Sequence, residues 1–145
     1  KPLAVILSCF DDTGLRKAKQ ICNCPVLGIG EASFVFSSLY SSQTAVITTV
    51  KEAIPIIKNN IKELGYANKV TDVIAADVEV LDLEYNQTAS AMKFAKASEG
   101  LNPSIKNIIL GCAGAVNIKN EFERLTGYTA FDGVTSAAKL CRALL

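Results

Sequence analysis

The same short pattern occurs twice in this chain, once near each end. An apolar run typical of a buried strand leads into Cys9, and a similar run leads into Cys112. Gly30 follows Cys9 by 21 residues and stands between a second apolar stretch and a predicted helix. Gly133 follows Cys112 by the same 21 residues, in the same context. Equal offsets in equal contexts predict an internal duplication, in which two equivalent units each carry one cysteine at a strand end.

Strand and helix patterns alternate along the chain with short connections, which predicts an α/β fold with parallel strands. Strands are predicted over residues 3–8, 26–29, 43–49, 70–75, 105–111 and 129–132. Helices are predicted over residues 15–21, 31–41, 52–64, 86–98, 117–125 and 135–144. Asp12 or Thr13 is the expected N-cap of the first helix. Residues 78–83 are expected to form a strand or an extended connection, and Met92 is expected to face inward.

The charge balance excludes several classes of function. Fifteen basic and 14 acidic residues give a formal net charge of +1, so the chain has no basic footprint for nucleic acid. No apolar run reaches the roughly 18 residues that a membrane span requires, and no signal-peptide pattern is present. The chain starts at Lys1, directly before a predicted core strand, and we expect the native N-terminal part to be missing.

The chain contains no histidine, which restricts its chemistry. Catalysis by Ser-His-Asp or Cys-His groups is excluded, and any proton transfer must use Cys, Asp, Glu, Lys or Tyr. Five cysteines in a spacing that matches neither a CxxC motif nor a zinc pattern predict a reduced, cytoplasmic protein without a metal site. Cys22, Cys24 and Cys141 are interpreted as small core residues, the usual role of a free cysteine.

Cys9 and Cys112 differ from the other three cysteines because each stands at the carboxyl end of a predicted parallel strand. Open α/β folds bind their ligands at that edge. Two thiols opposed across a cleft would suit a reaction that removes a proton from one face of a carbon and returns a proton to the other. A free thiol has a pKa of about 8.5, so one of the pair must be activated, and helix N-termini and backbone amides are the available activators.

Three other features allow both a structural and a functional interpretation. Thr48 and Thr49 end a strand, where they are either ordinary strand threonines or hydroxyl donors for a carbonyl or carboxylate. Asp11 and Asp12 are expected to cap a loop or helix rather than to bind metal. The pair Asp132-Gly133 is expected to form a turn or helix cap.

Five segments together resemble the hydantoin racemase branch of the aspartate/glutamate racemase superfamily. They are SCFDDTGL (8–15), PVLGIGEA (25–32), AVITT (45–49), LGCAG (110–114) and DGV (132–134). The segments occur in the family's order over nearly the whole chain. Gly-Cys-Ala-Gly around Cys112 is closer to hydantoin and allantoin racemases than to amino-acid racemases.

The resemblance implies two pseudo-symmetric lobes with parallel sheets flanked by helices, approximately residues 1–42 plus 128–145, and residues 43–127. It also implies that the chain is the C-terminal part of a longer family protein. The implied reaction is cofactor-independent racemisation of a hydantoin, allantoin or amino-acid derivative, with Cys9 and Cys112 as the acid/base pair. The substrate-contact positions that it implies are Phe10, Asp11, Thr48, Thr49, Ala113 and Gly114. The resemblance is also compatible with assembly of the protein into a homo-oligomer.

Other readings remain at this point. The chain could be another member of the superfamily, such as an amino-acid racemase, an arylmalonate decarboxylase or a maleate isomerase. The decarboxylase pattern uses only the second cysteine, so the presence of Cys9 argues against it. A reading from a different class is a small-molecule binding domain that kept the fold and lost the chemistry. A racemase requires both sulfurs to face one pocket, whereas a binding domain does not.

Overall fold

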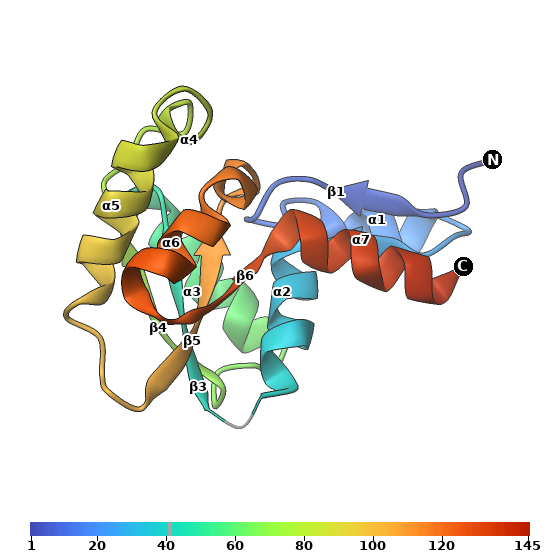
Figure 1. Ribbon diagram of the computed structural model, residues 1–145. Helices are drawn as coiled ribbons and strands as arrows, with labels where there is room; N and C mark the ends of the chain where they lie inside the picture. Colours follow the sequence, from blue (N-terminus) through green and yellow to red (C-terminus); the bar gives the residue numbers. More distant parts are fainter. Residues whose placement is uncertain (41) are drawn as a thin grey trace.

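The strands form two separate parallel sheets, shown in a computed structural model that describes residues 1–40 and 42–145 (Figure 1). The strands are β1 (Val5–Leu7), β2 (Val26–Gly28), β3 (Gln43–Thr48), β4 (Val70–Ala75), β5 (Ile105–Gly111) and β6 (Thr129–Asp132). The α-helices are α1 (Leu15–Ile21), α2 (Ile29–Ser38), α3 (Ile54–Glu63), α4 (Asp82–Tyr85), α5 (Gln87–Ser98), α6 (Lys119–Thr126) and α7 (Gly133–Leu144). Two 3-10 turns, η1 (Lys51–Ala53) and η2 (Ala113–Asn117), precede α3 and α6.

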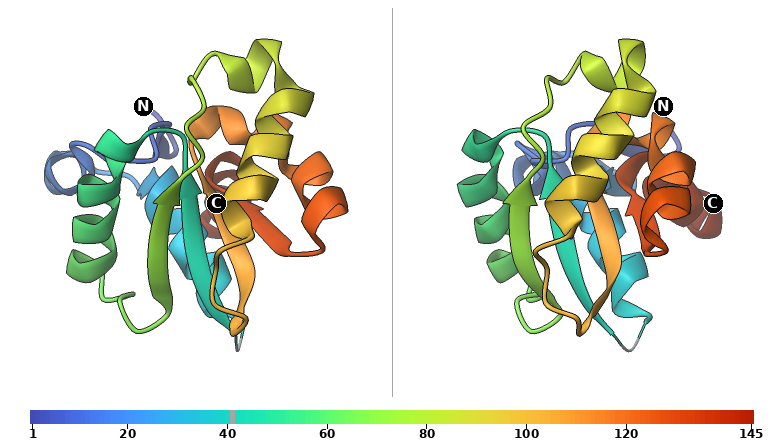
Figure 2. Two further views of the ribbon diagram at one scale, coloured as in Figure 1. Left: turned by 90° about the vertical axis from the view of Figure 1, so that its left-hand side faces the viewer. Right: turned by 60° about the vertical axis from the view of Figure 1, so that its left-hand side comes forward.

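The larger sheet has the strand order β4-β3-β5-β6, and every neighbouring pair is parallel. Successive side chains of a strand point to opposite faces, and the two cores follow this alternation. Ile108 and Leu110 belong to the core beneath α5 and α6, whereas Ile109 belongs to the core beneath α2 and α3. Figure 2 shows α3 and α5 flanking this sheet. Burial on both faces explains why β3 and β5 are continuous apolar runs.

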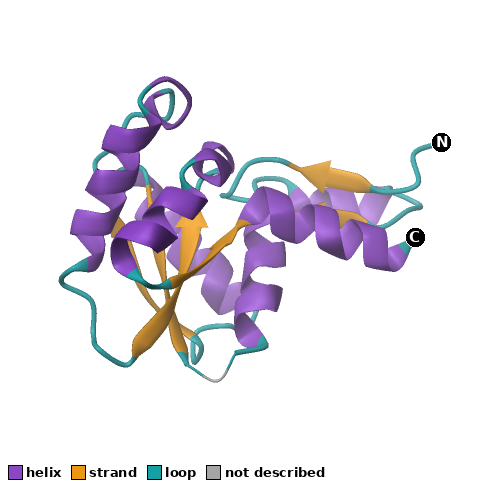
Figure 3. Cartoon of the chain, in the orientation of Figure 1, coloured by secondary structure: helices purple, strands orange, loops and turns teal. Residues whose placement is uncertain are grey.

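The smaller sheet consists of β1 and β2 alone, paired in parallel from Val5 opposite Val26 to Leu7 opposite Gly28. It lies apart from the larger sheet, and both chain termini lie on its side of the molecule (Figure 3). Helices α2 and α7 pack against each other and connect the two sheets. At their contact, a methyl group on Gly133 would lie 2.8 Å from the carbonyl oxygen of Ile29. Only glycine therefore allows this approach.

The order of elements repeats. The segment β1–α1–β2–α2 has a counterpart in β5–η2–α6–β6–α7, and in each the two strands are parallel neighbours. Each cysteine follows the first strand of its segment, and each second strand leads directly into a helix. The predicted α/β fold with parallel sheets flanked by helices is confirmed. The predicted division into lobes stays a prediction. In this chain, β6 pairs with β5, and α7 packs on α2.

Several predicted details are wrong. Helix α1 has Gly14, in a left-handed conformation, as its N-cap instead of Asp12 or Thr13, because the Asp12 carboxylate caps α2. Residues 78–81 form a connection without a strand, one of the two expected alternatives, but the short helix α4 begins at Asp82, within the predicted span. Met92 is exposed, because the inward face of α5 is carried by Ala91 and Phe94.

Most helices also begin or end one or two residues from the predicted bounds: α3 spans Ile54–Glu63, α5 begins at Gln87 and α7 begins at Gly133. Helix α2 begins at Ile29 and ends at Ser38, and the predicted end at Ser41 lies outside the described residues. Helix α6 begins at Lys119, after the η2 turn. Within residues 1–40 and 42–145, none of the helices combines the length and apolarity that crossing a bilayer requires.

Candidate active site

The two cysteines of the repeated pattern follow the carboxyl ends of β1 and β5. Cys9 is exposed and Cys112 is half-buried, and both are free thiols. The loop after β1 runs toward the end of β5 and the η2 turn (Figure 1). Strand β1 has one paired neighbour, whereas β5 is paired on both sides, which accounts for the deeper position of Cys112. The structure therefore brings the cysteine ends of the two repeated segments toward one another.

The Cys112 thiol lies in an electrostatic environment that opposes its ionisation. Burial is the largest effect that raises its pKa, and the negative charges of Cys9 and Asp11 raise the pKa further. Hydrogen bonds from the backbone N–H groups of Gly114 and Ala113 act in the opposite direction. The Cys9 sulfur is thus close enough for its negative charge to oppose ionisation of the Cys112 thiol.

Ala113 and Gly114 belong to the η2 turn, which starts immediately after Cys112. Their N–H groups stand in the first turn of η2, where they lower the pKa of the Cys112 thiol. Gly114 is also packed closely against α4, since a methyl group there would lie 3.2 Å from the Cβ atom of Leu83. The backbone donors beside Cys112 are therefore held by the packing of η2 on α4.

Thr48 and Thr49 lie beside the Cys112 strand end, because Thr48 of β3 is in register with Gly111 of β5. Both threonines are buried. The Thr48 hydroxyl donates a hydrogen bond to the Gly111 carbonyl at 3.1 Å, so it already has an acceptor within the sheet. The hydroxyl oxygen of Thr48 can still accept a hydrogen bond, but its proton is already donated to Gly111.

Phe10 and Asp11 follow Cys9 directly and have different surroundings. The Phe10 side chain is buried and meets the ring of Phe34 on α2 edge to face, with a centroid separation of 6.1 Å. It therefore anchors the loop in the core. Asp11 is half-buried, and its carbonyl accepts a hydrogen bond of 2.6 Å from Asn60 on α3. Asn60, which no sequence pattern singles out, thus connects the Cys9 loop to α3 beside the larger sheet.

Asp12 also holds this loop, through its side chain. Its carboxylate accepts hydrogen bonds from the N–H groups of Gly30 and Glu31, at 3.2 Å and 2.7 Å. Burial is the main reason that the pKa of Asp12 is raised to about 6, although these two hydrogen bonds lower it. A sequence signal existed in the pair Gly28 and Gly30, whose missing side chains leave the space that the carboxylate fills.

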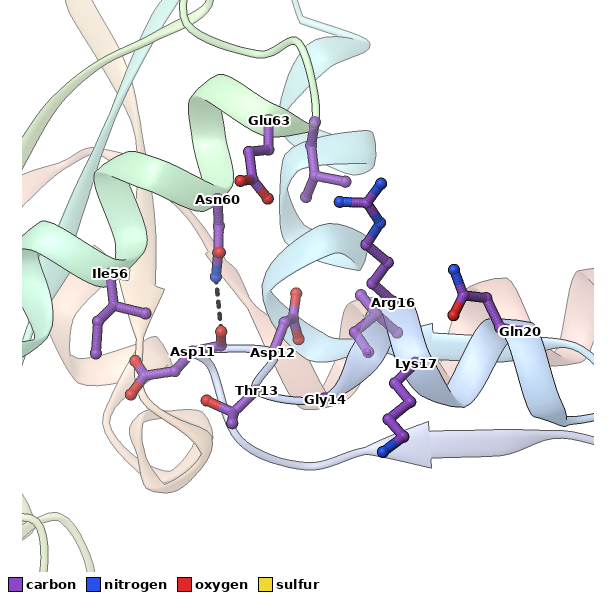
Figure 4. Close-up of a pocket in the computed structure, with 12 residues that line it drawn as sticks. Asp11, Asp12, Thr13, Gly14, Arg16, Lys17, Gln20, Ile56, Asn60 and Glu63 are labelled. Atoms are coloured by element: carbon purple, nitrogen blue, oxygen red, sulfur yellow. Dashed lines mark hydrogen bonds between the residues drawn. The ribbon is translucent and has the colours of Figure 1, made fainter.

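A pocket of about 580 Å³ lies between the Asp11–Gly14 loop, α1 and α3 (Figure 4). Asp11, Arg16, Asn60 and Glu63 contribute polar groups to its lining, and neither cysteine lines it. The pocket therefore adjoins the cysteine site through Asp11 and does not coincide with it.

The remaining cysteines lie elsewhere. Cys22 follows the last turn of α1, Cys24 lies two residues further on, and Cys141 lies in α7; all three are half-buried. The predicted helix cap at Asp132 is confirmed, since its carboxylate accepts a hydrogen bond of 2.7 Å from the N–H of Thr135.

Comparison with known proteins gives a consistent result. Residues 2–141 match a family described as Asp/Glu/Hydantoin racemase. A hydantoin racemase of Rhizobium meliloti is 35% identical over 148 residues, which cover 98% of this chain and 60% of that protein. A hydantoin racemase of Pseudomonas sp. strain NS671 is 24% identical over 98% of this chain and 58% of that protein. The chain thus spans about 60% of the length of these relatives.

Solved structures resemble the fold closely. The allantoin racemase from Pseudomonas fluorescens has a TM-score of 0.91 at 26% identity, covering 99% of this chain and 63% of that chain. The allantoin racemase from Klebsiella pneumoniae has a TM-score of 0.87 at 25% identity, covering 98% and 59%. A glutamate racemase from Bacillus anthracis shares the fold, with a TM-score of 0.74 at 16% identity. The match covers 99% of this chain and 57% of that chain.

Proposed function

The chain belongs to the Asp/Glu/hydantoin racemase family, and we propose that it carries both catalytic thiols of a racemase. The proposed substrate is a 5-substituted hydantoin or an allantoin-like compound, the classes named for the similar proteins described above. The observation that carries the proposal is the pair of strand-end cysteines, Cys9 and Cys112, whose charges interact.

The proposed reaction needs one thiolate and one thiol. The thiolate takes the proton from one face of the stereocentre, and the electron pair of the broken C–H bond remains as a carbanion. The opposite thiol then gives its proton to the other face and becomes the thiolate. The product has the inverted configuration, and the roles of the sulfurs are exchanged. No histidine is available for these transfers, and the thiol pair supplies both base and acid, so we expect no cofactor.

The electrostatics of Cys112 support such a one-thiolate, one-thiol state. Burial and the charge of Cys9 both raise its pKa, which favours Cys112 as the protonated partner before the reaction. The N–H groups of Ala113 and Gly114 reduce the cost of ionising Cys112 once it has given its proton away.

The same sheet edge offers groups for the substrate. Negative charge that develops on a carbonyl oxygen beside the carbanion requires hydrogen-bond donors. We propose that Thr49 and the backbone at Ala113 and Gly114 supply them on the Cys112 side. On the Cys9 side we propose the backbone N–H groups of Phe10 and Asp11, because the Phe10 ring is buried and the Asp11 carboxylate can only accept hydrogen bonds. Thr48 would contribute through the oxygen of its hydroxyl group.

Polarimetry of the full-length protein tests the proposed function. Enantiomerically pure hydantoins, allantoin and amino acids are incubated separately with the enzyme, and the loss of optical rotation is followed. We expect loss of rotation with at least one hydantoin or with allantoin, and none with the amino acids. Turnover of amino acids alone would identify an amino-acid racemase, and binding without any turnover would identify a binding domain.

A further inference from the structure

We propose that Asp12 is the positioning residue for the Cys9 thiol, because its carboxylate fastens the Cys9 loop to the N-terminus of α2. This inference rests on the proposed function and adds a residue to it. Asp12 does not touch the reacting atoms in this account. It acts through the backbone that carries Cys9.

Three polar groups of Asp12 connect three parts of the structure. Its carboxylate accepts hydrogen bonds from the first turn of α2, at Gly30 and Glu31. Its N–H donates to the Cys9 carbonyl at 3.0 Å, and its own carbonyl accepts from the N–H of Leu15 at the start of α1, also at 3.0 Å. Asp12 thus bonds to the cysteine residue itself and to both adjacent helices, in addition to the contacts that Phe10 and Asn60 make with the loop.

The absence of side chains at Gly28 and Gly30 leaves the space that the Asp12 carboxylate occupies. A methyl group on Gly28 would collide with the Asp12 carboxylate, and one on Gly30 would lie 2.8 Å from Oδ2. Asp12 also has a φ of 50°, in the left-handed region that is unfavourable for residues other than glycine, asparagine and aspartate. A strained backbone of this kind persists where surrounding contacts determine it. Here the two hydrogen bonds to α2 are those contacts.

Cys9 depends on this fastening more than Cys112 does. Cys9 is exposed and lies beyond the end of a three-residue strand, with Phe10 and Asp12 as the neighbours that tie it to α2. Cys112 directly follows β5, which is hydrogen-bonded on both sides. In the segment that carries Cys112, the N-terminus of α7 is capped by the carboxylate of Asp132. Asp132 lies at the end of β6 and not in the loop after Cys112. Loss of the Asp12 carboxylate should therefore displace one thiol and spare the other.

Asp12→Asn is the variant of choice, because asparagine has the same shape and tolerates a left-handed backbone. Its amide group replaces one acceptor by a donor, so one α2 N–H loses its partner. Asp77→Asn is the matched control: Asp77 has a φ of 51°, but it is exposed, and its carboxylate forms a surface ion pair with Lys51. Its carbonyl accepts a hydrogen bond of 3.4 Å from Lys93, which the substitution leaves in place.

The first measurement isolates each face of the substrate in the full-length protein. With Cys112→Ser only Cys9 remains to exchange the α-proton in deuterated water, and with Cys9→Ser only Cys112 remains. Adding Asp12→Asn should lower exchange at Cys9 by about tenfold or more and leave exchange at Cys112 within about twofold. Asp77→Asn should change neither. Equal losses at both cysteines, or no loss at either, would overturn the positioning role.

The second measurement does not depend on the proposed function. A short bis-maleimide adds one thiol across each of its two double bonds, and mass spectrometry identifies the Cys9–Cys112 cross-link. We expect Asp12→Asn to lower its yield by about threefold or more, and Asp77→Asn to leave it unchanged. An unchanged yield with Asp12→Asn would overturn the inference. If neither single-cysteine protein exchanges a proton, the proposed function fails, and the cross-link alone decides the role of Asp12.

Discussion

Among single residues, Asp12 combines burial and charge in a way that stability measurements can detect. Burial raises its pKa to about 6 against the lowering effect of the hydrogen bonds from the N–H groups of Glu31 and Gly30. The charge of Glu31 adds to the rise, and the charge of Lys19, its ion-pair partner, opposes it. The folded state therefore binds a proton more tightly than the unfolded state, where the pKa is near 3.8. Protonation of the Asp12 carboxyl therefore adds nothing to the free energy of unfolding well above pH 6. Its contribution increases as the pH falls from about 6 to about 4.

We predict that the free energy of unfolding of Asp12→Asn lacks this pH dependence. Relative to the variant, the parent should gain up to about 3 kcal/mol between pH 7 and pH 4. Urea unfolding of both proteins at a series of pH values measures the difference. Parallel curves for the two proteins would show that the Asp12 carboxyl titrates as it does in the unfolded chain.

The two strand-end cysteines and a capping role for Asp12 were predictable from sequence, whereas the helix that Asp12 caps and the role of Asn60 were not. Apolar runs determine where β1 and β5 end, so the residues that follow each run can be located without a structure. The partners of Asp12 lie 18 and 19 residues away, and those of Asn60 lie 49 residues away. Neither contact leaves a periodic pattern in the sequence. Only the glycines at positions 28 and 30 record the presence of the Asp12 carboxylate.

At the scale of elements, the junction of α2 and α7 depends on Gly133. We predict that Gly133→Ala destabilises the fold by about 1–3 kcal/mol, because its methyl group would lie 2.8 Å from both the Cβ atom and the carbonyl oxygen of Ile29. Backbone atoms cannot give way as a flexible side chain can. The variant should also lower kcat/KM of the full-length protein, since these helices join the two cysteine-bearing segments.

Gly100→Ala is the control, because nothing lies within 4 Å of the added methyl group. Its effect on the free energy of unfolding should stay within about 0.5 kcal/mol. Thermal or urea unfolding measures both variants. Equal stability of Gly133→Ala and the parent would show that α2 and α7 do not pack at this distance.

Elements with strong patterns were predicted within a residue or two, and the errors have local causes. The bounds of α1, β4, β5 and β6 agree with the prediction, since apolar runs and flanking turn residues mark their ends. Helix α4 was missed because four residues are too few to show a helical period. The cap of α1 was assigned wrongly because Asp12 is placed by a contact between helices distant in sequence.

At the scale of the whole molecule, two segments with the same order of elements surround their cysteines differently. Cys9 is exposed at the end of a two-stranded sheet, and Cys112 is half-buried at the end of a central strand. A repeated topology thus yields two thiols with unequal burial, and the pKa of the more buried Cys112 is raised. In the proposed mechanism, this favours Cys112 as the proton donor for one enantiomer, and the two thiols exchange roles for the other.

The most direct test of the account is proton exchange by the two single-cysteine variants in deuterated water. Each pure enantiomer is incubated with full-length Cys9→Ser or Cys112→Ser, and proton NMR follows the α-proton. Serine is too weak an acid to replace a thiol. We therefore predict that neither variant racemises the substrate, that each slowly exchanges the α-proton of one enantiomer, and that the two variants prefer opposite enantiomers. Cys24→Ser, the control, should retain racemisation. Exchange of the same enantiomer by both variants, or full racemisation by either, would contradict the two-thiol account.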